Sequence, residues 1–205
     1  MHVLRGKYSL SSFQTIIIGF AGTILIGSLL LMLPIASVSG RVTPFHEALF
    51  TATSATCVTG LIVHDTATYW TIFGQVVILA LIQIGGMRVV TMAALLTILS
   101  GKKIGLMQRN TMQEAISARS MGGIVKLTSF IVKCTVLVES IGAFLMMPVF
   151  CRDFGIGKGI WYSFFHSISA FCNAGFDLMG IRQKYSSLMY YVSNPLINLT
   201  IMGLI

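Results

Sequence analysis

Two short segments carry the hydroxyl and thiol side chains that could take part in covalent chemistry. Positions 54–60 read Ser-Ala-Thr-Cys-Val-Thr-Gly, and positions 169–175, 115 places later, read Ser-Ala-Phe-Cys-Asn-Ala-Gly. A serine or cysteine nucleophile needs a neighbouring base and a third group that orients this base. Neither a Gly-x-Ser-x-Gly sequence nor a suitably placed His and Asp accompanies either segment. We therefore expect no enzyme.

Candidate ligands for a resident metal or cofactor are scattered along the chain. The histidines at 46, 64 and 166 form no His-x-x-x-His or His-Glu-x-x-His pattern, and the four cysteines form no Cys-x-x-Cys pair. Zinc sites and nucleotide sites have recognisable spacings, and no Gly-x-Gly-x-x-Gly or Walker A sequence is present. We expect no cofactor, and we interpret the histidines as polar residues near one membrane face.

The composition indicates an integral membrane protein. Of 205 residues, 55% are hydrophobic and 10% are charged, and the mean hydropathy is +0.86. Soluble domains carry roughly 25% charged residues, so a soluble enzyme and a disordered chain are both excluded as defaults. The net charge of +8 would suggest nucleic acid on a soluble protein. Here it is typical of membrane-flanking loops, so we expect contact with lipid and no nucleic-acid partner.

Uncharged runs locate the elements that must position the two segments. A helix needs about 20 apolar residues to cross the bilayer. The expected spans cover 13–35, a run from 65 that continues to 99, 127–150, and a last run that starts at Tyr185. Asn194 and Pro195 resemble a helix cap followed by proline at the first helical position. The residues that remain after Pro195 are too few to cross, so we expect a fragment of a longer chain.

Basic residues predict the orientation of these spans. Residues 101–126 carry five Lys or Arg and the single acid Glu114, and Arg5 and Lys7 precede the first span. Because cytoplasmic loops retain Lys and Arg, we expect 101–121 to be a cytoplasmic linker. The N-terminus would then be cytoplasmic, and the chain would be a multi-pass protein of the plasma membrane with 36–69 and 151–187 outside.

The two segments belong to a longer internal repeat. Leu33-Pro34 and Met147-Pro148 close the preceding spans, and Phe50 and Phe165 each lie four residues before the shared serine. Repeats of this kind build transporters around a common axis. We expect an all-α membrane protein with tandem helix–pore loop–helix repeats around a pore. Residues 1–100 form the first repeat and 122–205 the second, truncated in its last helix, so about one and three-quarter repeats are present.

The segment before the first loop predicts a half-membrane helix. Thr43 suits the N-cap, Pro44 the first helical position and Glu47 the first turn. A helix over 44–54 would be about 16 Å long, which is half the bilayer. Non-helical backbone at that depth is tolerated where it lines a water-filled cavity. We expect residues 55–61 to line a pore as an extended strand, with the negative end of the helix favouring a cation.

These loops, together with Gln83-Ile84-Gly85-Gly86-Met87, resemble the Trk/Ktr/HKT potassium transporter superfamily, and within it the membrane subunit of the bacterial Ktr system. The resemblance implies four repeats around one pore, each with one filter glycine, of which Gly60 and Gly175 are the first two. It implies that the carbonyls of Val58, Thr59, Gly60, Asn173, Ala174 and Gly175 bind potassium, the transported ion. It also implies a homodimer and a cytosolic ring of nucleotide-binding regulatory subunits.

Two other functions stay open. One is a sodium-permeable relative, although related proteins that admit sodium have serine where this chain has Gly60. The other is a non-conducting membrane fragment or assembly partner, since the pore would need four repeats. Arg88 stands where the family usually has a small residue. Two interpretations are open: its side chain extends to the inner leaflet, or it faces the pore. Lys133 and Glu139 lie on different faces of one helix, which favours partners elsewhere in the bundle over a direct pair; a gating role is the alternative.

Overall fold

A computed structural model describes residues 12–86 and 124–205, so Arg88 and the expected linker 101–121 lie outside the described residues. In the described ranges the regular elements are helices, with one isolated β-bridge between Ser37 and Trp70. The α-helices are α1 (Ser12–Met32), α2 (Phe45–Thr56), α3 (Thr66–Tyr69), α4 (Ile72–Gly86), α7 (Ile124–Phe154), α8 (Ile156–Phe171) and α9 (Pro195–Leu204). The short 3₁₀ helices are η1 (Pro34–Ala36), η2 (Met179–Ile181) and η3 (Ser187–Tyr191).

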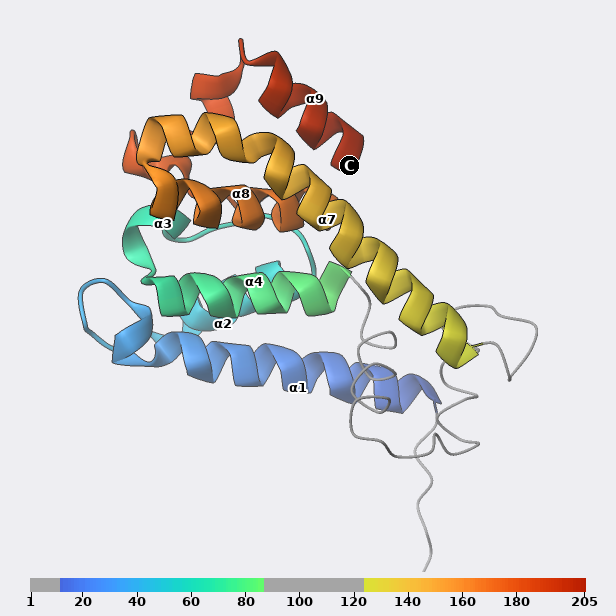
Figure 1. The fold of residues 1–205 in the computed structure, drawn as a ribbon. Coiled ribbons are helices and arrows are strands. Elements are labelled where there is room, and N and C mark those ends of the chain that lie inside the picture. Colours follow the sequence, from blue (N-terminus) through green and yellow to red (C-terminus); the bar gives the residue numbers. More distant parts are fainter. Residues whose placement is uncertain (1–11, 87–123) are drawn as a thin grey trace, which may run out of the picture.

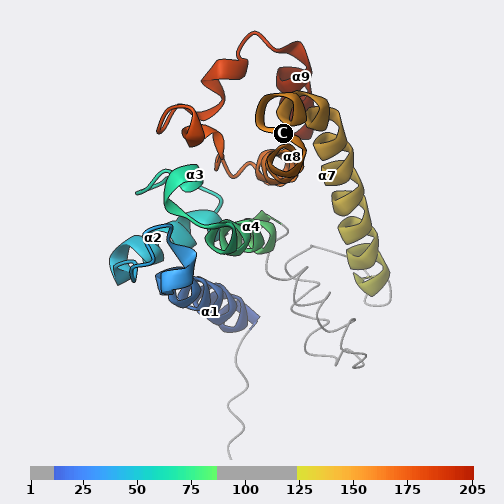
Figure 2. The ribbon, with the colours of Figure 1, turned by 60° about the vertical axis from the view of Figure 1, so that its left-hand side comes forward.

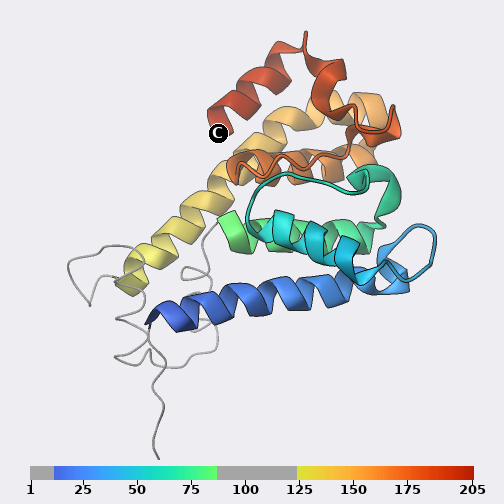
Figure 3. The same ribbon diagram turned by 180° about the vertical axis from the view of Figure 1, so that it is seen from behind.

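Helices α1, α2 and α4 form the first helix group. α1 and α4 run side by side, and α2 packs against both, as the rear view shows (Figure 1, Figure 3). α1 ends just before Leu33-Pro34, as expected. Two backbone hydrogen bonds join the segment after α1 to the residues just before α4. The Val38 N–H donates to the Tyr69 carbonyl at 2.9 Å, and the Thr71 N–H donates to the Ala36 carbonyl at 2.9 Å.

Helices α7, α8 and α9 form the second group, in which α7 packs against both others. The expectation that Pro148 closes the span is wrong, because α7 continues through it to Phe154. Proline removes one backbone N–H and bends a helix, and α7 is visibly bent in its orange portion (Figure 1). At α9 the expected cap is confirmed: Asn194 Oδ1 accepts from the N–H groups of Leu196 and Ile197 at 3.1 and 3.2 Å.

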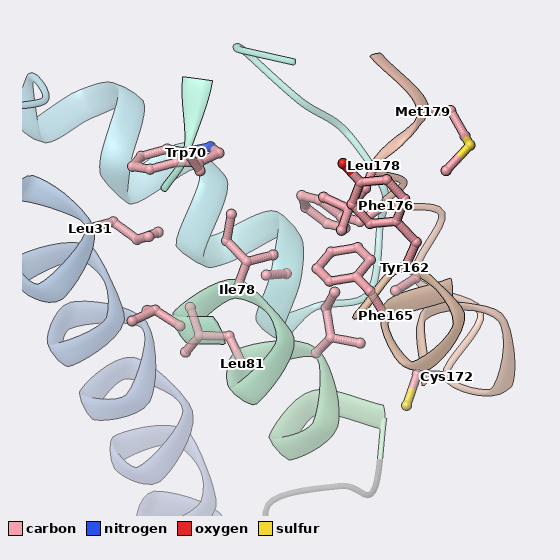
Figure 4. Close-up of a cluster of buried hydrophobic side chains, with 14 of the residues drawn as sticks. Leu31, Trp70, Ile78, Leu81, Tyr162, Phe165, Cys172, Phe176, Leu178 and Met179 are labelled. Carbon is pink, nitrogen blue, oxygen red and sulfur yellow. The ribbon is translucent and has the colours of Figure 1, made fainter. Parts of the chain in front are cut away.

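The two groups meet where α4 packs against α8, and α4 lies between α1 and α8 (Figure 2). The apolar core is continuous across this contact: Leu31, Ile78 and Leu81 lie on one side and Phe165 on the other (Figure 4). A polar bond crosses it as well, since Trp161 Nε1 donates to Gln75 Oε1 at 2.8 Å.

Among the described helices, α7 holds the one stretch, Ser129–Phe154, that is long and apolar enough to cross a membrane by length and composition. This stretch overlaps the expected third span. The other apolar helices in the described ranges are shorter: Ile17–Met32, Ile72–Gly86 and Pro195–Leu204.

Candidate functional site

The helix expected before the first loop is α2, and it begins and ends later than the sequence suggested. Pro44, with φ −54° and ψ 140°, is itself the N-cap, and its carbonyl accepts from the Glu47 and Ala48 N–H groups at 3.1 and 3.0 Å. Thr43 is therefore not the cap, because the helical turn starts one residue further on. Its hydroxyl lies 3.2 Å from the Tyr69 hydroxyl instead.

The loops after α2 and α8 have the same backbone conformation. Cys57 and Cys172 cap the two helices with nearly equal angles (φ −86°, ψ 0° and φ −79°, ψ −2°). The next residues, Val58 and Asn173, have φ of 58° and 56°, and Gly60 and Gly175 have φ of 72° and 71°. The expectation of an extended strand over 55–61 is wrong, because α2 continues to Thr56 and the left-handed Val58 then folds the loop back toward the helix. The second loop has the same conformation.

Equivalent hydrogen bonds produce this conformation in both loops. The Thr59 N–H donates to the Ser54 carbonyl at 3.0 Å, and the Ala174 N–H donates to the Ser169 carbonyl at 2.7 Å. Such bonds satisfy carbonyls that the last helical turn leaves unpaired. Each loop therefore ends its helix with a fixed backbone conformation that is held by hydrogen bonds.

The two loops converge although they lie 115 residues apart. A Cβ atom placed on Gly60 would lie 2.7 Å from the Ala174 carbonyl oxygen and 3.3 Å from Gly175 Cα. A Cβ placed on Gly175 would lie 3.4 Å from Gly60 Cα. The structure therefore brings the two glycines into direct apposition, with Ala174 beside them. A side chain at Gly60 would separate the loops, whereas a Cβ at Gly175 would only touch the opposite loop.

The carbonyl groups of these loops have no protein partner within the described ranges. None of the hydrogen bonds between described residues is accepted by a main-chain oxygen of Val58, Thr59, Gly60, Asn173, Ala174 or Gly175. Of these residues Ala174 is buried, Val58 and Gly60 are partly exposed, and Thr59, Asn173 and Gly175 are exposed.

The glycine pair of α4 explains why the loops can approach each other. A Cβ on Gly85 would overlap the Thr56 carbonyl at the end of α2, and a Cβ on Gly86 would overlap the Cys172 Sγ at the end of α8. The C-terminal end of α4 therefore packs against the ends of α2 and α8 with no space for a side chain. Glycine at 85 and 86 is required by this close packing.

Glu139 of α7 lies behind the second loop. It is 5% exposed, and Gln83 Nε2 donates to its two carboxylate oxygens at 2.9 and 3.2 Å. The thiol of Cys172 is 3.9 Å from Gln83 Oε1. The expected bundle partner is thus found for Glu139, which pairs with Gln83. Lys133 is exposed, so the same expectation is not confirmed for it.

The segment that follows the first loop is tied back to the start of α2. His64 Nε2 lies 2.7 Å from Glu47 Oε2, and the His64 ring stacks on Tyr69 with centroids 3.8 Å apart. Hence Glu47, expected to interact with the helix dipole, also holds this segment. No cluster of three or more His, Cys, Asp or Glu that could hold a metal occurs within the described ranges.

A second polar cluster closes the end of α7 near η3. Arg182 pairs with Asp153 at 2.8 Å and lies over the rings of Phe154, Tyr190 and Tyr191. The Tyr191 hydroxyl donates to the same carboxylate at 2.7 Å. Burial, together with this bond to Asp153, raises the pKa of Tyr191 above its ordinary value. Tyr191 therefore stays a hydrogen-bond donor at physiological pH.

His166 is the functional candidate that the sequence analysis missed. It lies on α8 and is 3% exposed, so its ring is enclosed by protein. Its partners are the Tyr162 carbonyl and the Leu178 N–H, 12 residues ahead in the chain. The spacing of His166 and Ser169 on one helix face was the available indication, but it does not reveal that the chain returns to that face.

The structure thus contains two loops of equal conformation that meet at their glycines. In a comparison with known families, the model of the TrkH family, described as cation transport protein, matches residues 7–205. The chain belongs to this family.

Individual relatives carry more specific names. The chain is 46% identical over 176 residues to the potassium/sodium uptake protein NtpJ of Enterococcus hirae, covering 86% of this chain and 39% of the relative. It is 44% identical over 188 residues to the Ktr system potassium uptake protein B of Bacillus subtilis, covering 92% and 41%. For the protein of the same name in Vibrio alginolyticus the identity is 38% over 191 residues, covering 93% and 40%. The chain thus spans about two fifths of these relatives.

Proposed function

We propose that this chain forms part of the potassium pathway of a membrane uptake protein, with its two glycine loops as part of the selectivity filter. The observation that carries the proposal is the apposition of Gly60 with Ala174 and Gly175 in two loops of equal conformation. The names of the relatives from Bacillus subtilis and Vibrio alginolyticus support potassium as the ion.

In this proposal the ion is held by backbone oxygens alone. Carbonyls of Val58, Thr59 and Gly60 in one loop, and of Asn173, Ala174 and Gly175 in the other, replace water around a dehydrated cation. The C-terminal ends of α2 and α8 lie beside the loops, and their partial negative charge favours a positive ion there. No bond is made or broken, so the function is transport and no catalytic residue is needed.

The architecture proposed for the whole protein is four helix–loop–helix repeats around one pore. Residues 1–100 and 122–205 would supply the first two. We also propose that the protein is multi-pass, with a cytoplasmic N-terminus, and that it works as a homodimer with a cytosolic nucleotide-binding ring. The phrase "Ktr system" in the names of relatives supports a multi-component assembly.

A sodium-permeable transporter is the second candidate, because NtpJ is named for both potassium and sodium. Gly60 favours potassium, since a glycine lets the carbonyls converge closely. Purified full-length protein in liposomes distinguishes the two: rubidium influx that potassium blocks and sodium does not block supports the first candidate. Equal block by the two ions supports the second.

Gly175→Ser tests the filter assignment itself. Gly175 has space for a Cβ, at 3.4 Å from Gly60 Cα, so the variant should still insert in the membrane. The left-handed φ of 71° resists a side chain, so the loop must shift and potassium selectivity should fall about tenfold. Selectivity equal to that of the wild type would remove these loops from the filter.

A further inference from the structure

Residues 174–178, which include Gly175, are held by α8 at three alternate positions. The Ala174 N–H donates to the Ser169 carbonyl at 2.7 Å, and Ser169 Oγ donates to the Phe176 carbonyl at 2.6 Å. The Leu178 N–H donates to His166 Nε2 at 3.3 Å. His166 and Ser169 lie three residues apart, on one face of the helix. The three contacts bracket Gly175 on both sides.

The hydrogen bonds of His166 define its protonation. Nε2 must accept, because Leu178 offers an N–H, so the ring proton sits on Nδ1 and is donated to the Tyr162 carbonyl at 2.7 Å. The ring is 3% exposed, and the Phe150 and Phe165 rings lie 5.2 and 6.0 Å from it. A neutral imidazole of fixed orientation therefore joins the third turn of α8 to the segment beyond the loop.

The first loop has no such contact at the equivalent position. Thr51 stands where α8 has His166, and its hydroxyl donates to the Glu47 carbonyl within α2. The segment after Gly60 is instead held by the His64–Glu47 side-chain pair, whose members are 27% and 23% exposed. The segment after the second glycine is thus held by hydrogen bonds from buried side chains to its backbone. The segment after the first glycine is held by a partly exposed pair of side chains.

We propose that His166, assisted by Ser169, is a positioning residue for the carbonyls of Ala174 and Gly175, and that it thereby determines the cation preference of the second loop. This inference rests on the proposed function. A backbone held at Ala174, Phe176 and Leu178 cannot contract around a smaller ion, because each contraction would stretch one of these bonds. When the hydrogen bond from the Leu178 N–H to His166 is lost, the backbone after Gly175 can contract around a smaller ion. This contraction favours sodium.

The test compares two replacements of His166 in the full-length protein. His166→Phe keeps the ring volume but removes the acceptor, and His166→Gln keeps an acceptor oxygen. Losing one buried hydrogen bond in a coupled segment should lower the potassium-to-sodium uptake ratio about fivefold in His166→Phe. His166→Gln should restore most of the ratio. Thr51→Val is the matched control at the equivalent position of α2 and should leave the ratio unchanged.

The ratio separates positioning from folding, because a poorly folded variant loses uptake of both ions in proportion. Ser169→Ala serves as a second variant if His166→Phe reaches the membrane poorly, and it should lower the ratio in the same direction. A wild-type ratio in His166→Phe or in Ser169→Ala, or a His166→Gln ratio as low as that of His166→Phe, overturns the inference. If Gly175→Ser changes selectivity in the same assay, the proposed function stands on its own. If Gly175→Ser is also silent, the proposed function fails.

Discussion

At the scale of single residues, the two glycines of the paired loops are equivalent in sequence but not in surroundings. Both have φ near 70°, a region that L-residues with a Cβ rarely occupy. Gly60 faces the Ala174 carbonyl closely, whereas Gly175 has room for a methyl group. The same side chain should therefore cost more stability at 60 than at 175.

Gly60→Ala compared with Gly40→Ala measures this cost. Gly40 has a similar φ of 67° but open space around its Cβ position, so its replacement carries backbone strain alone, about 1–2 kcal/mol. Gly60→Ala adds a clash with backbone that has no flexible side chain to yield. Thermal unfolding of the purified full-length protein should show a larger loss of midpoint for Gly60→Ala. Equal losses would mean that the loops are not in close contact.

At the scale of elements, α4 is the helix that joins the two groups. Its Gly85 and Gly86 pack on the ends of α2 and α8, and Gln83 donates to Glu139 of α7. A carboxylate buried in a membrane-crossing helix is costly unless its lone pairs are satisfied. The hydrogen bond from the Gln83 amide therefore stabilises the packing of α7 against α4. The protein need not be more stable with this polar pair than with two apolar side chains of similar size in its place.

A double substitution tests this balance. Gln83→Leu leaves the Glu139 carboxylate buried without this donor and should destabilise the protein by about 1–3 kcal/mol. Adding Glu139→Leu removes the charge as well, so part of the loss should be recovered. Ser140→Ala is the control on the same helix, because its hydroxyl bonds only to the Val136 carbonyl. Additive effects of the two leucine substitutions would show that the side chains are not coupled.

At the scale of the whole molecule, the segments that follow the two glycine loops are joined to each other. Asp65 Oδ1 caps α3 by accepting from the Ala67 and Thr68 N–H groups, while Oδ2 accepts from the Tyr185 N–H at 3.0 Å. One buried carboxylate thus links residues 120 positions apart. Contacts between the two groups therefore occur both at Asp65, beyond the loops, and at Gly85 and Gly86, at the ends of α2 and α8.

The orientation proposed for the molecule rests on the charge of the basic linker, and labelling can test it. Gly157 lies beyond α7 with open space around it, and Gly105 belongs to the basic linker before that helix. In a cysteine-free background, an impermeant thiol reagent should label Gly157→Cys from outside intact cells. Gly105→Cys should be labelled only after the membrane is opened, because basic linkers stay cytoplasmic. Labelling of both from the same side would contradict the proposed topology.

Local sequence determined much of this protein. Hydropathy placed the long helices, Asn194-Pro195 identified the start of α9, and the shared serine, cysteine and glycine positions identified two equivalent loops. These features depend on hydrogen bonds within a few residues and on the cost of burying charge in lipid. Both act before any tertiary contact forms, and so they can be read from the chain.

Tertiary structure decided how these parts meet. Pro148 lies inside α7 rather than at its end, because packing against α8 and α9 supports a bent helix where proline alone favours a stop. His166 became an anchor because the chain returns past its own helix to present the Leu178 N–H. Gly60 and Gly175 meet because the end of α4 packs against the ends of both α2 and α8. Each result depends on groups distant in sequence that must bury surface and satisfy donors together, which no local pattern specifies.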